Sequence, residues 1–367
     1  MNRKERRAAA KQARSGRFGS NPDQAEEQVA RAIAMVQGES FAEAEALLSE
    51  VRRRHPDNVE AKHQLGMLLS RTGRADEGIA LVREAIAGRP GEALYWNNLA
   101  ASCLAVQRVE EAAEAAEKAV GFDPSYAMAW ENLGLARRDL RDAAGAAGAF
   151  ARAAKLGELF GGSLRGWGAC LAEIGEHAKA EEILRRLVQA EPEDSEGLAL
   201  LGQVLEDQGR PGEAREAYAK SLDVDPNQLA AALNYGSLLV KDPGEVDAGL
   251  RWLRRSTSIA PRSAPTWRLL ASALLNADRV EEAKEAIRQA ARFASPGDSE
   301  VAALQRRLKG GADGETVGPS ATLPGQAPVS IAAGAGLEPV VGKPKPAPVS
   351  GDQRGAAFDL TILKIGD

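Results

Sequence analysis

The sequence has few of the residues on which metal binding usually depends. Its 367 residues include three histidines and two cysteines. His55, His63 and His177 have no second ligand at the spacing of a zinc site, and Cys103 and Cys170 form neither a disulfide framework nor a zinc motif. Both cysteines fall on expected inner helix faces, where a buried small side chain is the simplest interpretation. We therefore expect no metal and no cofactor.

Motifs for catalysis are also missing. No glycine-rich phosphate loop follows a strand, and no nucleophile motif is present. Adjacent carboxylates such as Glu110 and Glu111 fall where solvated helix starts are expected. The sequence therefore predicts a protein that is not an enzyme and has no small-molecule substrate.

Long apolar runs are absent as well. No stretch approaches the roughly 20 apolar residues of a membrane helix, and the basic start is not followed by the apolar core of a secretory signal. These features predict a cytoplasmic protein that does not span a membrane. Residues 1–18 carry seven Lys or Arg and one Glu, although the net charge of the chain is −5. This basic arm is either a solvated tail or a weak contact for an anionic surface such as lipid or RNA.

Aromatic residues make up only 4% of the chain, whereas hydrophobic residues make up 44%, so alanine must supply much of the packing. Residues 93–126 show how. Two apolar stripes with helical spacing occur there, and a proline then ends the second helix. The first stripe comprises Trp96, Leu99, Ala100 and Cys103, and the second comprises Ala112, Ala116 and Ala119 before Asp123-Pro124.

This pattern recurs every 34 residues, apart from one extra residue near 241–244. The prolines at the ends of the units are Pro56, Pro90, Pro124, Pro192, Pro226 and Pro261. The paired residues of the first helices are Leu65-Gly66, Leu99-Ala100, Leu133-Gly134, Trp167-Gly168, Leu201-Gly202, Tyr235-Gly236 and Leu270-Ala271. Small residues at these positions allow close helix contact, and we expect the small alanines of the second helices to face them.

The repeat resembles the tetratricopeptide repeat family. The resemblance implies an all-α, right-handed α-solenoid of about eight helical hairpins with a cap helix and disordered ends. The expected hairpins are 25–58, 59–92, 93–126, 127–160, 161–194, 195–228, 229–263 and 264–297. Before them lies a basic disordered arm, 1–24, and after them come a capping helix, 298–309, and a disordered Gly/Pro/Ala-rich linker, 310–355.

Two segments depart from this regular pattern. The junction 155–163 lacks the expected proline and contains three glycines, which predicts the softest join between hairpins. Residues 356–367 end the chain with a hydrophobic motif in which Phe358, Leu360 and Ile362 alternate. We interpret this motif as a docking peptide, for a groove of its own chain or for a partner; the alternative is a tail without a role.

In the family, the face of each first helix that points away from its partner helix lines a groove for extended peptides. The resemblance places the following residues in that groove: His63, Gln64, Met67, Arg71, Asn97, Asn98, Ala101, Glu131, Asn132, Leu135, Arg138, Arg165, Gln203, Glu206, Asn234, Ser237, Lys241, Arg268, Ser272 and Asn276. The family's carboxylate clamp for chaperone C-termini is not matched, since its Lys and Asn would fall at His63 and Met67.

An amide recurs at one phase of the repeat, in Gln64, Asn98, Asn132 and Asn234. An amide has a donor and an acceptor, so it can pair with a peptide backbone without recognising side chains. This partly resembles the asparagine ladder in the repeats of O-linked N-acetylglucosamine transferase, although Gly166, Leu200 and Leu269 interrupt it. The alternative is a set of ordinary exposed helix asparagines.

Three functional hypotheses follow. The first is a non-enzymatic scaffold that binds a protein or peptide segment in its groove. The second is a substrate-selecting or regulatory partner of a separate glycosyl-, sulfo- or methyltransferase, because similar repeats are often fused to such domains. The third is a basic-armed adaptor at a membrane surface or a nucleic acid.

Overall fold

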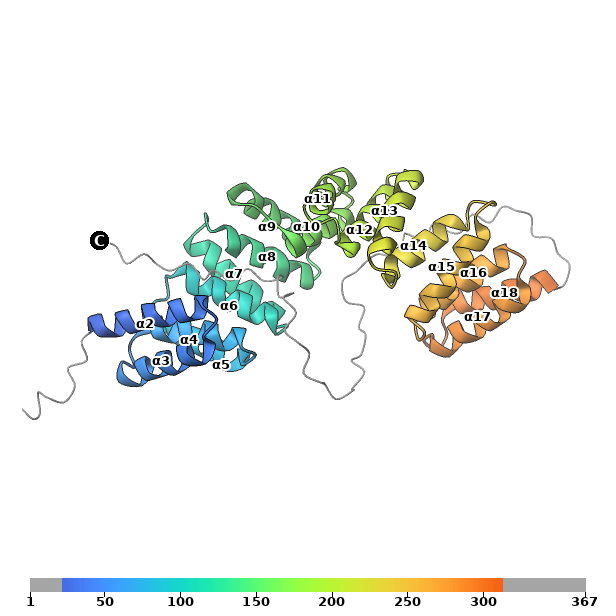
Figure 1. The fold of residues 1–367 in the computed structure, drawn as a ribbon. Helices are drawn as coiled ribbons and strands as arrows, with labels where there is room; N and C mark the ends of the chain where they lie inside the picture. The colour runs from blue at the N-terminus through green and yellow to red at the C-terminus, as the bar shows by residue number, and fades with distance from the viewer. Residues whose placement is uncertain (1–21, 313–367) are drawn as a thin grey trace, which may run out of the picture. The chain divides into compact units, whose positions relative to one another are not determined.

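The computed structural model describes residues 22–312 (Figure 1). Most of the basic arm, most of the linker and the C-terminal docking motif lie outside the described residues. Every regular element within 22–312 is a helix, which confirms the expected all-α class of stacked hairpins. The helices are α2 (Pro22–Gln37), α3 (Phe41–Arg54), α4 (Val59–Arg71), α5 (Ala75–Gly88), α6 (Ala93–Ala105), α7 (Val109–Phe122), α8 (Ala127–Asp139), α9 (Ala143–Leu156), α10 (Gly161–Glu173), α11 (His177–Ala190), α12 (Ser195–Asp207), α13 (Pro211–Val224), α14 (Leu229–Leu239), α15 (Val246–Ile259), α16 (Ala264–Asn276), α17 (Val280–Phe293) and α18 (Ser299–Ala312).

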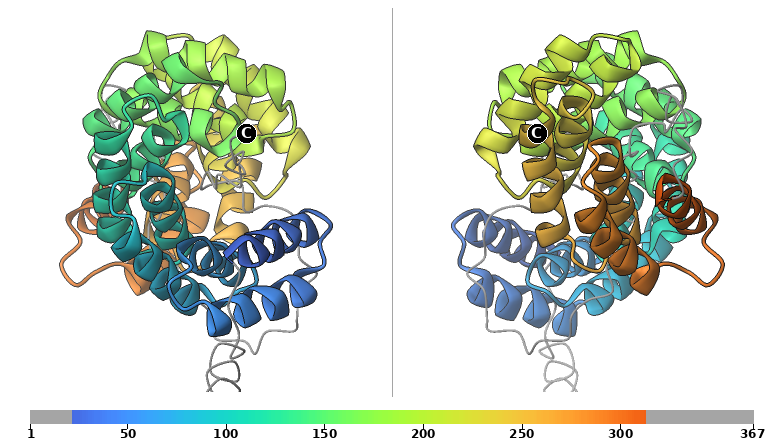
Figure 2. Two further views of the ribbon diagram at one scale, coloured as in Figure 1. Left: turned by 90° about the vertical axis from the view of Figure 1, so that its left-hand side faces the viewer. Right: turned by 90° about the vertical axis from the view of Figure 1, so that its right-hand side faces the viewer.

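The described chain divides into two compact units between Leu159 and Phe160. Unit 1 contains α2 to α9 and unit 2 contains α10 to α18. Within each unit, consecutive helices form hairpins, each with one first and one second helix, and neighbouring hairpins stack (Figure 2). The division lies within residues 155–163, the junction for which the sequence predicts a soft join.

The first helices lie closer to one another than the second helices do. In unit 1, Cα atoms of α2 and α4, of α4 and α6, and of α6 and α8 come within 8 Å. The first helices of unit 2 do the same, from α10 through α16, and α16 also contacts α18. Among the described residues, no two second helices of one unit contact each other. The first helices therefore form the narrower side of each unit, which we call its inner face.

Glycines allow the two helices of a hairpin to approach closely. A Cβ on Gly66 would lie 2.8 Å from the carbonyl oxygen of Gly78, so only glycine fits there. A Cβ on Gly134 would lie 2.8 Å from the ring of Phe150, and one on Gly202 would lie 2.6 Å from the ring of Tyr218. The expectation that alanines face these glycines is wrong in the latter two hairpins, because an aromatic ring fills the space instead.

The repeated tryptophans hold the turns between hairpins. Trp96 is half-buried, and its indole Nε1 donates a hydrogen bond of 2.8 Å to the carbonyl oxygen of Pro90. The same hydrogen bond to the carbonyl oxygen six positions earlier joins Trp130 to Pro124 at 2.9 Å and Trp267 to Pro261 at 2.8 Å. Trp96 shares an apolar stripe with Leu99 in the sequence, but its side chain fixes the preceding turn, whereas Leu99 is buried.

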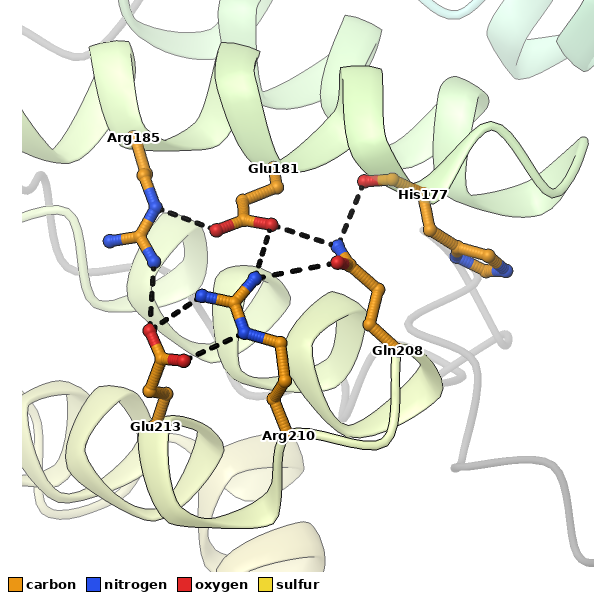
Figure 3. Close-up of polar contacts among 6 residues, drawn as sticks. All are labelled: His177, Glu181, Arg185, Gln208, Arg210 and Glu213. Atoms are coloured by element: carbon orange, nitrogen blue, oxygen red, sulfur yellow. Dashed lines mark hydrogen bonds and ion pairs between the residues drawn. The ribbon is translucent and has the colours of Figure 1, made fainter.

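Arginines in the turns connect successive hairpins. Arg210, between α12 and α13, binds Glu213 through Nε at 2.7 Å and Nη2 at 2.6 Å, and binds Glu181 of α11 through Nη1 at 2.7 Å (Figure 3). Gln208 adds bonds from its Nε2 to Glu181 at 3.0 Å and to the carbonyl oxygen of His177 at 3.2 Å. This polar cluster links the fifth hairpin to the sixth, and the side chains of Glu181, Arg210 and Glu213 are all paired within it, whereas His177 contributes only its carbonyl oxygen. Its hydrogen bonds and ion pairs give it a structural role as a join between hairpins.

The same join recurs in both units. Arg74 binds Glu45, Arg108 binds Asp76 and Arg279 binds Asp247, each across two successive hairpins. At the corresponding positions on either side of the unit boundary, the sequence has Asp142 and Glu176 instead. The arginine join is thus absent from these two turns.

Helix α9 ends at Leu156 and α10 begins at Gly161. The helix ends at a glycine in place of a proline: Gly157 is the C-cap of α9, with φ −165° and ψ 177°, which is extended backbone. The positive φ of +45° occurs at Gly161, at the start of the next helix. Phe160, between them, is 61% exposed.

Candidate binding faces on the first helices

Buried amide and imidazole side chains occur only on first helices among the described residues. They are His63 on α4, Asn97 and Asn98 on α6, Asn132 on α8, Gln203 on α12 and Asn234 on α14. Buried polar side chains on the second helices are hydroxyls, such as Ser221, which donates to the carbonyl oxygen of Ser195 at 2.7 Å. A buried polar group costs free energy unless it is paired. The confinement of buried amides and imidazoles to the first helices therefore needs a physical reason.

In unit 1 these side chains form one hydrogen-bonded row across three hairpins. The Nδ2 atom of Asn98 lies 3.0 Å from Nε2 of His63, and Nδ2 of Asn97 donates to Oδ1 of Asn98 at 3.2 Å. The Nδ2 of Asn132 donates to Oδ1 of Asn97 at 2.9 Å. The exposed fraction is 1% for His63 and 0% for the three asparagines, so they cannot be the ordinary exposed asparagines of the alternative hypothesis.

Glu60 anchors one end of this row. Its carboxylate accepts hydrogen bonds from Tyr95 Oη at 2.9 Å and from Gln64 Nε2 at 2.7 Å, and Nδ1 of His63 lies 3.6 Å from its Oε1. The His63 and Tyr95 rings are in contact, with centroids 4.4 Å apart and ring planes tilted by 35°. Burial alone would raise the pKa of Glu60, but the contact with His63 and the hydrogen bonds from Gln64 and Tyr95 outweigh burial and lower the pKa to about 2. The carboxylate is therefore held ionised.

Unit 2 carries a shorter set of polar side chains, and two of its atoms are unpaired. Gln203 is 7% exposed and Asn234 is 4% exposed. Neither Gln203 Oε1 nor Asn234 Nδ2 has a hydrogen-bond partner among the described residues. Beside them, Glu206 accepts from Tyr218 Oη at 3.3 Å and from Lys241 Nζ at 3.1 Å.

Asn234 also lies close to Tyr218, but no hydrogen bond of normal geometry joins the two, so the donor of the amide remains unpaired. The pKa of Tyr218 is raised, mainly by burial and also by the charge of Glu206. The phenol therefore stays protonated at neutral pH and donates to the carboxylate.

Several cations that the sequence places in the groove are ion-paired to the chain itself. Arg165 binds Asp194 at 2.8 Å and Glu196 at 3.0 Å. Arg268 binds Asp298 at 2.7 Å and Glu300 at 2.8 Å, which is the same pattern of two acids two positions apart. In each case one of the acids is at the start of the next first helix. These arginines fix neighbouring hairpins and are not available to bind an acidic ligand.

The remaining candidates differ in exposure. Met67, Ala101 and Leu135 are buried; Gln64, Glu131, Arg138, Ser237 and Ser272 are half-buried; Arg71, Lys241 and Asn276 are exposed. Arg138 pairs with Asp139 at 2.8 Å, Arg71 lies over the ring of Phe41, and Asn276 accepts a hydrogen bond from Arg307. The prediction that one face of each first helix is open to a ligand is therefore too simple for α6, which is buried from Asn97 to Leu104.

Sequence reasoning missed Glu60, Tyr95 and Tyr218. Tyr95 immediately precedes the Trp96 of the repeat, and Glu60 lies 35 residues before Tyr95. That spacing of 35 also separates His63 from Asn98 and Asn97 from Asn132, so it is the spacing at which neighbouring first helices meet. A search for polar pairs 35 residues apart would have found the row.

Residues 22–312 contain neither a metal-binding cluster nor a membrane-spanning helix. No group of three or more His, Cys, Asp or Glu side chains in this part of the chain could hold a metal ion. No helix in it is long and apolar enough to cross a membrane. The two cysteines are buried, and burial raises the pKa of the Cys103 thiol to about 11, so that thiol is unreactive.

Family models cover nearly the whole described chain. Tetratricopeptide repeat models match residues 35–103, 98–163 and 131–195. The model of the TPR domain of cytochrome c-type biogenesis protein H matches residues 176–301. No curated protein matches the sequence.

Solved structures of TPR proteins are similar in fold. A chain of the APC/C hetero-tetramer Cut9–Hcn1 is 18% identical with a TM-score of 0.53, covering 73% of this chain and 52% of that chain. PilF of Pseudomonas aeruginosa is 18% identical with a TM-score of 0.50, covering 56% of this chain and 93% of its own. YrrB, described as a TPR protein with an unusual peptide-binding site, is 24% identical with a TM-score of 0.44, covering 49% and 92%. The helical hairpins, the phased repeat and the matching models together show that this chain belongs to the tetratricopeptide repeat family.

Proposed function

We propose that this protein is a non-enzymatic scaffold that binds an extended segment of a protein partner on the inner faces of its hairpin units. The observation that carries the proposal is the confinement of buried amide and imidazole side chains to the first helices. A helix pair needs no such groups for packing, and apolar residues in their place would avoid the cost of desolvation. A peptide backbone, in contrast, has one donor and one acceptor per residue that such groups can bind.

The arrangement favours recognition of a backbone over recognition of a charged side chain. Arg165 and Arg268, two of the three cations expected in the groove of unit 2, are each held by two acids of the chain, and the third, Lys241, is paired with Glu206. The amides have no charge and accept any sequence that can extend along them. Affinity would then come from several hydrogen bonds of about 0.5–1.5 kcal/mol each, together with burial of apolar side chains.

The family match over residues 176–301 lies in unit 2 and supports a search for the partner there. It does not carry the biology of cytochrome c biogenesis to this chain, because it concerns a repeat domain and not a whole protein. The partner is therefore defined by its chemistry, as an extended polypeptide segment.

Site-specific photocrosslinking tests the proposal. A benzoylphenylalanine replaces Ser237, which is half-buried on the inner face of α14, and in a control chain it replaces Lys220, which is exposed on the second helix α13. We expect a crosslinked partner in extracts of the native host only from the Ser237 position. Equal crosslinking from Lys220, or crosslinking from Lys220 alone, would contradict binding on the inner face.

A further inference from the structure

The hydrogen-bonded row of unit 1 has a single direction. The Nδ2 atom of Asn132 donates to Oδ1 of Asn97 at 2.9 Å, and Nδ2 of Asn97 donates to Oδ1 of Asn98 at 3.2 Å. The Nδ2 atom of Asn98 then lies 3.0 Å from Nε2 of His63. Asn97 and Asn98 therefore each accept with their oxygen from one neighbour and donate with their nitrogen to the next. All three amide donors are directed along the row towards the imidazole.

This direction fixes the protonation of the His63 ring. An amide nitrogen can only donate, so Nε2 of His63 has to accept from Asn98, and the proton of the neutral ring is then on Nδ1. The Nδ1 atom lies 3.6 Å from Oε1 of Glu60, which is too far for a hydrogen bond of normal geometry, and it has no other partner among the described residues. His63 is therefore neutral in this arrangement, with its N–H on the side of Glu60 and its lone pair on the side of Asn98.

The surroundings of the ring provide a counter-charge for a second proton. Glu60 precedes His63 on α4 and is held ionised, as its lowered pKa shows. From α6, the ring of Tyr95 contacts the imidazole, and its hydroxyl donates to the same carboxylate at 2.9 Å. Helices α2, α3 and α5 also pack against α4, and within residues 22–312 none of their charged side chains forms an ion pair with His63. An imidazolium beside Glu60 is therefore compensated on its Nδ1 side, whereas its Nε2 atom would have to donate.

We propose that the row is a proton-driven switch: when His63 takes up a second proton from solvent, on Nε2, the three asparagine amides reverse and the row runs in the opposite direction. A protonated Nε2 can donate only to an oxygen, so Asn98 turns its Oδ1 to the ring and its Nδ2 to Asn97. Asn97 then accepts with Oδ1 and donates with Nδ2 to Oδ1 of Asn132. The reversed row keeps the same number of hydrogen bonds between these side chains.

Burial makes the reversal extend over the whole row. His63 is 1% exposed and the three asparagines are 0% exposed, so water cannot take the place of a lost partner without rearrangement. If only His63 changed, two N–H groups would face each other 3.0 Å apart, and a buried polar group left in this way is costly. If only Asn98 turned, the same conflict would move to Asn97. Proton uptake on α4 is thereby coupled to the donors and acceptors of α6 and α8.

Nitrogen NMR of the full chain, with isotopically labelled histidine and asparagine side chains, tests the proposal. At neutral pH, long-range proton–nitrogen spectra should show His63 with its proton on Nδ1 and with an unprotonated Nε2. As the pH is lowered, the side-chain amide signals of the three asparagines should shift with the titration of His63, at one common midpoint. Asn234 of unit 2 is the internal control, because the residue 35 positions before it is Ala199, and its amide signal should not follow this titration.

A variant that interrupts the row tests whether the reversal is transmitted. In Asn97→Ala, the titration of His63 should still shift the amide signal of Asn98 but no longer that of Asn132, whereas Gln24→Ala, an exposed amide on α2, should leave the common shift intact. A shift of Asn132 that survives in Asn97→Ala would overturn the transmission.

The spectra of the unchanged chain decide the proposal even if Asn97→Ala does not fold. A proton on Nε2 of His63 at neutral pH would overturn the direction of the row. Amide signals that stay fixed while His63 titrates, or a His63 that stays neutral until unit 1 unfolds, would overturn the switch. These measurements need no partner, so their outcome is independent of the proposed function.

Discussion

Replacement of Asn98 by alanine tests the hydrogen-bonded row of unit 1. Asn98 contacts His63 Nε2 at 3.0 Å and accepts from Asn97 Nδ2 at 3.2 Å. Asn98→Ala removes both contacts at a position that is 0% exposed, where water cannot enter without rearrangement. Each buried group left without its partner costs about 1–3 kcal/mol, so with partial relaxation we expect a loss of about 2–4 kcal/mol in the free energy of unfolding of unit 1.

The readout must separate the two units, because hairpin repeats can open locally. Urea unfolding followed by circular dichroism gives the total change, and native-state hydrogen exchange locates it. Exchange should become faster in α4, α6 and α8, whereas α12 to α16 should keep their protection and serve as an internal control. Gln24→Ala, which removes an exposed amide on α2, should change stability by less than about 0.5 kcal/mol. An effect of Asn98→Ala no larger than that of Gln24→Ala would refute the buried row.

Three other predictions concern packing, pH and the unit boundary. Gly134→Ala should destabilise by about 1–3 kcal/mol because its Cβ would meet the Phe150 ring at 2.8 Å, whereas Gly148→Ala in the same hairpin, with nothing within 4 Å, should be neutral or stabilising; equal effects in thermal melts would contradict the close contact. The pKa of about 2 for Glu60 lies below the ordinary 4.5 of the unfolded state, so Glu60 should contribute up to about 3 kcal/mol above pH 4.5 and lose it as the pH falls towards 2. The stability difference between wild type and Glu60→Gln should accordingly shrink over that range, and a difference independent of pH would argue against the assignment. Hydrogen exchange should show less protection at residues 155–165 than at the Asp123-Pro124 and Asp225-Pro226 turns, and equal protection at all three would remove the soft join.

The phase of the repeat was sufficient to predict the hairpins. Small residues such as Gly66 and the turn prolines recur at fixed positions, and each marks a contact that any neighbouring hairpin must repeat. The function of Trp96 was missed because helical periodicity treats it as one more apolar residue, whereas its indole N–H is used to hold Pro90. Periodicity describes which face a residue occupies but not which polar atom it binds.

The inner face could be predicted only in part. The shared phase of Asn98, Asn132 and Asn234 places three amides on first helices, but all three are buried, which the phase alone does not predict. The sequence alone suggests that removing these amides would leave melting unchanged, and the structure gives the opposite expectation in unit 1. The reason is that Asn98 and Asn132 bind residues 35 positions away, and a pattern with a period of 34 does not reveal that pairing.

The most direct test of partner binding on the inner faces is a hydrogen-exchange footprint of the partner recovered by crosslinking at position 237. The full chain is compared with and without that partner under identical conditions. The account predicts that added protection is confined to first helices, with its largest value in α12 and α14. Added protection on the second helices α11, α13 and α15, with none on α12 and α14, would contradict it.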